Sequence, residues 1–146
     1  MPFHTTAAEH FEKLKRVHAR LDGEVHKDDL DDFFKTAYHL IENIEKCSNT
    51  TVEQKLTAKA LRSDPEMELC REICNLQKHY TLRPKSHPSP AIANADIQQG
   101  FGIGRFGKGG FGVGEQSVWL NFNDGTQRDA HVLAGSIFGK FARVFA

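Results

Sequence analysis

The sequence predicts an α+β protein, with an N-terminal helical bundle of about four helices, then a small antiparallel sheet with a long Gly-rich loop and a C-terminal helix. Apolar residues recur at three-to-four-residue spacing over the first eighty or so positions. A proline-rich stretch, residues 83–90, then excludes a helix. At 146 residues and 39% hydrophobic content, the chain is expected to form a single domain, 1–146, with a helical part over 5–82 and a β-hairpin plus terminal helix over 91–146.

The first helix is predicted to begin at Thr6, because Thr6 and Glu9 have the spacing of a capping box. It closes near residues 22–23, and its apolar positions are Phe11, Leu14, Val17 (or His18) and Leu21. A second helix begins around residues 27–29, where the carboxylates suit the positive end of the helix dipole. Its broad apolar face comprises Leu30, Phe33, Phe34, Ala37, Leu40, Ile41 and Ile44.

Residues 48–51 interrupt the second helix and cap a third one, which runs through Leu61. Residues 63–65 cap a fourth helix, since proline is favoured at the first helical position, and this helix runs to about Tyr80. Its core side is predicted to comprise Leu69, Ile73, Leu76 and Tyr80.

Beyond the prolines, residues 91–98 are predicted to form a strand, and residues 117–122 alternate with the period of two of a half-buried strand. Residues 123–126 have the composition of a hairpin turn. Over 130–145 a closing helix is predicted, despite Gly135 and Gly139. Its apolar face comprises Leu133, Ile137, Phe141 and Val144.

The charge balance argues against a global affinity for polyanions. Lys plus Arg equals Asp plus Glu at 19 each, so no net basic field draws the chain to nucleic acid or anionic lipid. Three cysteines and no apolar leader after Met1 favour thiols in a reducing cytoplasm. No apolar run approaches the roughly twenty residues that span a bilayer, so we expect no membrane association.

Residues 100–114 hold eight glycines in fifteen positions. The segment contains G-x-G-x-x-G, but a strand is predicted to follow where the nucleotide fingerprint needs a helix, and no P-loop ending is present. A better description is a Phe-Gly-x-Gly-x unit repeated from Phe101, Phe106 and Phe111. These rings are expected to dock on the protein's own core, on a partner or on a second copy. A further alternative is RNA contact, with Arg105 and Lys108 on the backbone and the rings on bases.

The fourth helix carries a polar stripe, since Arg71, Asn75 and His79 follow one another at steps of four with Lys78 beside them. Such a stripe is a candidate phosphate site. His79 would act as general acid or base, Arg71 would stabilise developing charge and Asn75 would orient the group. The alternative is an ordinary solvated face, or polar groups that bond the adjacent loop.

The run from Asn75 to His79 resembles the Asn-x-x-x-His half of the signature of HEPN domains, the higher eukaryotes and prokaryotes nucleotide-binding family. That resemblance, over roughly residues 5–82, implies a helical bundle, often dimeric, of bacterial toxins and antiviral systems, in which an arginine directly before the asparagine and the later histidine cut RNA. This chain departs from the signature, because Cys74 occupies the arginine position. The order of features also resembles bacterial proteins of unassigned activity.

The histidines, cysteines and aspartates show no ligand set, so neither a metal nor another cofactor is predicted. We therefore expect a non-catalytic, cytoplasmic bacterial interaction module that binds a protein partner or itself as a homodimer, through the Phe-Gly loop and the Phe-rich C-terminal helix. The alternative is a HEPN-like RNA-binding protein or a metal-independent endoribonuclease.

Overall fold

The structure, a computed structural model, describes residues 6–22, 27–79, 92–99 and 116–146. Within these ranges the chain forms helices and strands in the predicted order, which confirms the α+β class. The helices are α1 (Ala7–Ala19), α2 (Lys27–Lys46), α3 (Val52–Leu61), α4 (Pro65–His79) and α5 (Ala130–Val144). The strands are β1 (Ile92–Gln99), β2 (Gln116–Phe122) and β3 (Gln127–Asp129).

Side-chain caps fix the predicted helix starts. The hydroxyl of Thr6 accepts from the Glu9 N–H at 3.1 Å. Thr51 and Gln54 form a reciprocal capping box, with N–H to side-chain distances of 3.0 and 2.9 Å. At α5 the Asp129 carboxylate accepts from the first-turn N–H of His131 at 2.8 Å. These bonds satisfy N–H groups that have no partner within the helix.

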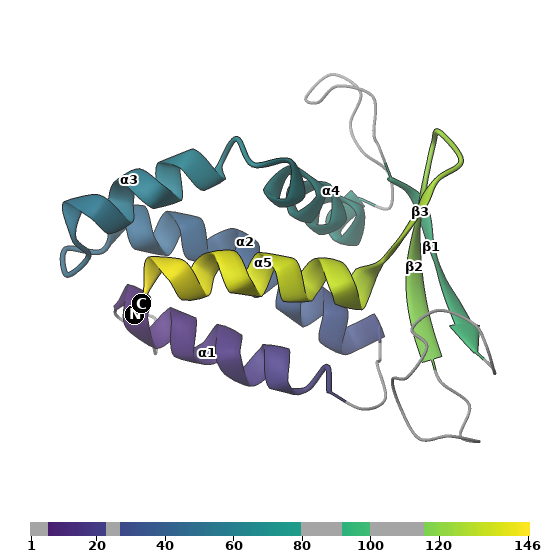
Figure 1. Cartoon of the computed structure of the whole chain (residues 1–146), viewed down its shortest axis with the longest axis horizontal. Helices are drawn as coiled ribbons and strands as arrows, with labels where there is room; N and C mark the ends of the chain where they lie inside the picture. The colour runs from purple at the N-terminus through teal and green to yellow at the C-terminus, as the bar shows by residue number, and fades with distance from the viewer. Residues whose placement is uncertain (1–5, 23–26, 80–91, 100–115) are drawn as a thin grey trace.

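Helix α5, although last in the chain, lies at the centre of the helical layer. It contacts all four other helices, β2 and β3. Figure 1 shows α5 crossing the bundle, with α1 on one side, α3 and α4 on the other, and the sheet at the end where α5 begins. Leu133, Ile137 and Phe141 are completely buried. The predicted helical and β parts therefore share one hydrophobic core.

The sheet is antiparallel with the order β1-β2-β3, so β2 is its central strand. Between β2 and β3 the chain turns with Gly125 at φ +88°, a conformation that glycine adopts without strain. Val118 and Leu120 alternate onto one face, are buried, and belong to the helical core. One face of the sheet thus packs on the helices, as the alternation predicts.

The core side of α4 differs from the prediction. The buried residues of its described part are Met67, Cys70, Glu72, Ile73 and Cys74. Of the predicted set, Ile73 is buried and Leu69 only partly so, while Tyr80 and the side chain of Leu76 lie outside the described residues. The helix therefore turns Cys70 and Cys74 towards α2, where both thiols donate to the Phe34 carbonyl.

Candidate functional site

The polar stripe of α4 is held on one continuous helix, as predicted, because α4 extends through His79. Arg71 is mostly shielded, and its guanidinium donates to the Glu68 carboxylate at 2.9 and 3.1 Å. Asn75 is half-buried. The side chains of Lys78 and His79 lie outside the described residues, so the structure brings together only Arg71 and Asn75 of the predicted set.

The residue before Asn75 lies on the core side of α4. Cys74 is 6% exposed, and its thiol donates to the Phe34 carbonyl at 3.5 Å. Cys70 donates to the same oxygen at 3.1 Å. Hydrogen bonding to Cys74 and burial raise the pKa of the Cys70 thiol well above its ordinary value. Both thiols are therefore buried hydrogen-bond donors in the core, and the raised pKa keeps the Cys70 thiol protonated.

A charged cluster that the sequence did not indicate joins α4 to β3 and α5. One oxygen of Glu66 accepts from Ser136 at 2.6 Å and from Lys140 at 2.9 Å, and the other accepts from Arg128. Lys140 also bonds Asp64 at 2.6 Å. Sequence spacing could not reveal these contacts, because Asp64 and Glu66 lie more than sixty residues from their partners.

In this cluster, hydrogen bonds and opposite charges offset the cost of burying the ionised Glu66 and Lys140 side chains. Burial raises the pKa of Glu66, but hydrogen bonds from Ser136, Lys140 and Arg128 outweigh burial and the net pKa is lowered. Burial lowers the pKa of Lys140, but its bonds to Asp64 and Glu66 raise the net value. An ammonium and a weakly basic carboxylate do not activate the Ser136 hydroxyl as a nucleophile. The cluster therefore joins the three elements structurally.

Helix α3 exposes aliphatic side chains in a row. Val52 is 75% exposed and Leu56 is 62% exposed, and Ala60, one turn further, is also exposed. At 100° per residue these positions lie on one face, here named the α3 ridge. The opposite side of α3 buries Ala58 and Leu61 in the core. In the sequence, the α3 ridge is indicated by apolar residues on both sides of a short helix.

The predicted aromatic partner surface needs a correction. Phe141 is completely buried, and Phe138 and Phe145 stack on Phe11 of α1 with ring centroids 5.9 and 4.5 Å apart. Phe141 is thus part of the protein's own core, and Phe138 and the C-cap residue Phe145 pack against it. The Phe-Gly loop candidates lie outside the described residues: Phe101, Phe106, Phe111, Arg105 and Lys108.

Within the described part of the chain, no three His, Cys, Asp or Glu side chains gather in a way that would hold a metal ion. No helix in that part combines the length and the apolar character needed to cross a bilayer. Comparison with family models finds no matching family, and comparisons with curated proteins and with solved structures find no similar chain.

Proposed function

We propose that this protein is a non-catalytic interaction module that binds a second protein chain, a copy of itself or a different partner, through the α3 ridge. The observation that carries the proposal is the exposure of Val52 and Leu56, 75% and 62%, one turn apart on the same helix. No disulfide involves Cys47, Cys70 or Cys74, which supports a reducing compartment, so we place this function in the cytoplasm.

Covering the α3 ridge would supply part of the binding free energy of such an interaction. Full burial of a Val or Leu side chain contributes about 1.5–3 kcal/mol, so covering the exposed fractions of Val52 and Leu56 contributes about 2–4 kcal/mol. That is roughly 30-fold to several hundred-fold in affinity. On the helical wheel Lys55 and Lys59 flank one side of the ridge and Glu53 the other. An apolar strip between charged flanks is typical of a small interface centre.

The first test separates self-association from binding of a different protein. Sedimentation equilibrium of the wild-type chain is compared with Leu56→Lys and with Val132→Lys, a matched control because Val132 is 54% exposed but lies on α5. For a self-associating ridge, the mass of wild type and Val132→Lys rises above 16.4 kDa with concentration, whereas Leu56→Lys stays monomeric. If all three stay monomeric, self-association is excluded. If all three associate equally, the ridge is not the interface.

The RNA-directed alternative has one supporting observation: the continuity of α4 through His79, which keeps Arg71, Asn75 and His79 in register. The buried Cys74 supplies no cation, and Arg71 is engaged by Glu68. Mixed RNA incubated with wild type, His79→Ala and His39→Ala tests this alternative, since His39 is an exposed histidine on α2. Cleavage that only His79→Ala abolishes would support it. Intact RNA with all three proteins would rule out the nuclease alternative.

A further inference from the structure

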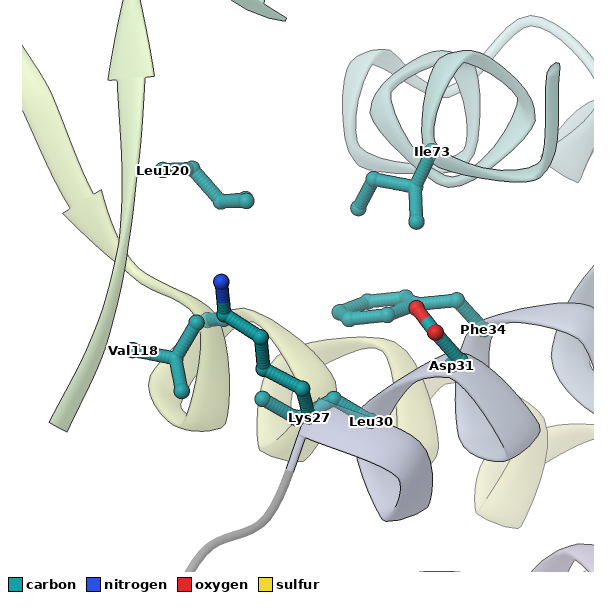
Figure 2. Close-up of a pocket in the computed structure, with 8 residues that line it drawn as sticks. Lys27, Leu30, Asp31, Phe34, Ile73, Val118 and Leu120 are labelled. Carbon is teal, nitrogen blue, oxygen red and sulfur yellow. The ribbon is translucent and has the colours of Figure 1, made fainter. Parts of the chain in front are cut away.

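A cavity of about 110 Å³ lies where the first turn of α2, the middle of α4, strand β2 and the start of α5 meet. Figure 2 shows apolar side chains from α2, α4 and β2 around this space, together with Lys27 and Asp31 of α2. Both of these charged residues already have interaction partners in the protein. The N-terminus of α5 is capped by the Asp129 carboxylate. The described lining of the cavity therefore leaves no charged group available to orient a ligand.

The charged residues beside the α3 ridge differ in this respect. Glu53 and Lys59 are exposed and Lys55 is half-exposed. Among the residues that the structure describes, these three side chains form no hydrogen bond or ion pair. The charge of Lys55 helps to lower the pKa of the nearby Cys47 thiol, but no carboxylate pairs with the ammonium. The ridge is thus an apolar strip whose flanking charges remain available to a partner.

The two flanks of the ridge carry opposite charges. At about 100° per residue, Glu53 lies on one side of Leu56, and Lys55 and Lys59 lie on the other. Two copies of α3 can meet ridge to ridge about a two-fold axis in two ways. An axis parallel to the helix makes the two helices parallel and places the lysine flank of each copy against the glutamate flank of the other. An axis perpendicular to the helix makes them antiparallel and places lysine flank against lysine flank.

The heights of the charges along the helix favour the parallel arrangement. There, each ridge residue meets the same residue of the other copy. Glu53 and Lys55 are two residues apart, so the facing charges differ in height by about 3 Å, and the symmetry forms this pair twice. In an antiparallel pair centred on Leu56, Lys55 of each copy lies opposite Lys59 of the other. Like charges facing each other across an interface are unfavourable, so electrostatics selects the parallel pair.

We propose that the α3 ridge docks on a second copy of this chain, with the two α3 helices parallel and Glu53 of each copy paired with Lys55 of the other. This inference rests on the proposed function and names which partner the ridge binds. A second copy fits because one surface supplies both the apolar strip and the complementary flanks. Helix α3 has ten residues and is about 15 Å long, so the contact is smaller than the about 800 Å² per partner of a standard interface. A weak dimer is expected, with a Kd of about 0.1–1 mM.

Disulfide crosslinking of the full chain tests the orientation. Cys47 is first replaced by serine, because its half-exposed thiol lies near α3. Val52→Cys and Ala60→Cys are then oxidised at about 1 mM, separately and mixed, with Val132→Cys as the control because Val132 is 54% exposed on α5. The parallel dimer predicts that each α3 variant crosslinks to its own kind about tenfold or more faster than the control. Preferential disulfides between the two α3 variants would indicate an antiparallel pair and overturn the proposal.

Exchange of the flanking charges tests the pairing. Glu53→Lys and Lys55→Glu each place like charges across the parallel interface, so each should weaken self-association about threefold to tenfold in sedimentation equilibrium. The double variant Glu53→Lys/Lys55→Glu restores opposite charges and should return to within about twofold of the wild type. Lys35→Glu makes the same charge change at an exposed position of α2 and is the matched control, expected to change the Kd less than about twofold. Circular dichroism verifies the fold of each variant.

The outcomes separate this proposal from the proposed function. A wild-type chain that stays monomeric at about 1 mM, single charge variants that behave like Lys35→Glu, or a double variant that fails to recover would each overturn the parallel dimer. If the wild type is monomeric but the ridge binds a different protein, the second-copy proposal fails and the proposed function stands. If the ridge binds neither, both fail.

Discussion

Replacing Glu66 by glutamine removes the carboxylate that joins α4 to β3 and α5. In the native protein its oxygens accept from Ser136 at 2.6 Å, from Lys140 at 2.9 Å and from Arg128. The side chain is 13% exposed, so water replaces little of what is lost. Glutamine preserves the shape of the side chain and one acceptor oxygen, which makes the change electrostatic rather than steric.

The expected loss lies between two limits. Hydrogen bonds to charged groups contribute about 1.5–3 kcal/mol each, and breaking a fully buried ion pair costs about 3–5 kcal/mol. Here Arg128 is 36% exposed, and Lys140 retains its bond to Asp64 at 2.6 Å. The loss of stability is therefore well below the sum of the individual hydrogen-bond contributions. We predict that Glu66→Gln lowers the free energy of unfolding by about 2 kcal/mol. The control Glu68→Gln breaks a local, half-exposed pair with Arg71 and should cost at most about 0.5 kcal/mol.

The pH dependence gives this prediction a second readout. The pKa of Glu66 is lowered in the folded state, so its contribution is present above the ordinary carboxyl value of about 4.3 and is lost as the pH falls below it. The pKa of Lys140 is raised, so its contribution is present below about 10.4 and is lost as the pH rises further. Urea unfolding at about pH 7 and about pH 3 should show the difference between wild type and Glu66→Gln shrinking in acid. Equal stabilities of Glu66→Gln and Glu68→Gln at neutral pH would refute the reasoning.

The other predictions concern single residues. Thr51→Ala removes the capping box of α3 and should lower the free energy of unfolding by about 1 kcal/mol in urea titrations. Backbone N–H groups, above all that of Ala7 at the start of α1, lower the pKa of the half-exposed Cys47 thiol. Cys47 should therefore react with a thiol reagent well before the buried Cys70 and Cys74, and mass spectrometry of the labelled protein measures this order. Burial lowers the pKa of His18, which stacks on an α5 phenylalanine at 4.2 Å, so the wild type should lose more stability than His18→Phe as the pH falls from about 6.5 towards about 5, above the range in which carboxyl groups titrate.

Local signals made the helix starts predictable. Thr6, Thr51 and Pro65 each favour a helix start through effects on neighbours only a few residues away. The sequence alone therefore predicts where α1, α3 and α4 begin. The turn at Gly125 was predictable for the same reason, although the three-residue β3 was not located, because its Gln-Arg-Asp sequence has no apolar pattern.

Long-range contacts account for what the sequence did not predict. The buried side of α4 is determined by the contacts of Cys70 and Cys74 with Phe34 on α2. Helical spacing alone did not distinguish this side from the one that contains Leu69. The partners of Glu66 lie on elements that follow the predicted loop. The exposure of Leu56 was indicated only by apolar residues on both sides of α3, since an apolar residue in a helix otherwise predicts burial unless its neighbours are known.

The most direct test of an interaction role is position-specific photocrosslinking through the α3 ridge. A photoreactive amino acid is placed at position 56 and, as the control, at position 132 of α5, which is 54% exposed in the native chain. The proposal predicts a discrete crosslinked species from position 56, a second copy or one partner, that excess unlabelled wild type displaces and excess Leu56→Lys does not. Position 132 should give no such species. Equal crosslinking from both positions, or no displaceable species from position 56, would contradict the interaction role of the ridge.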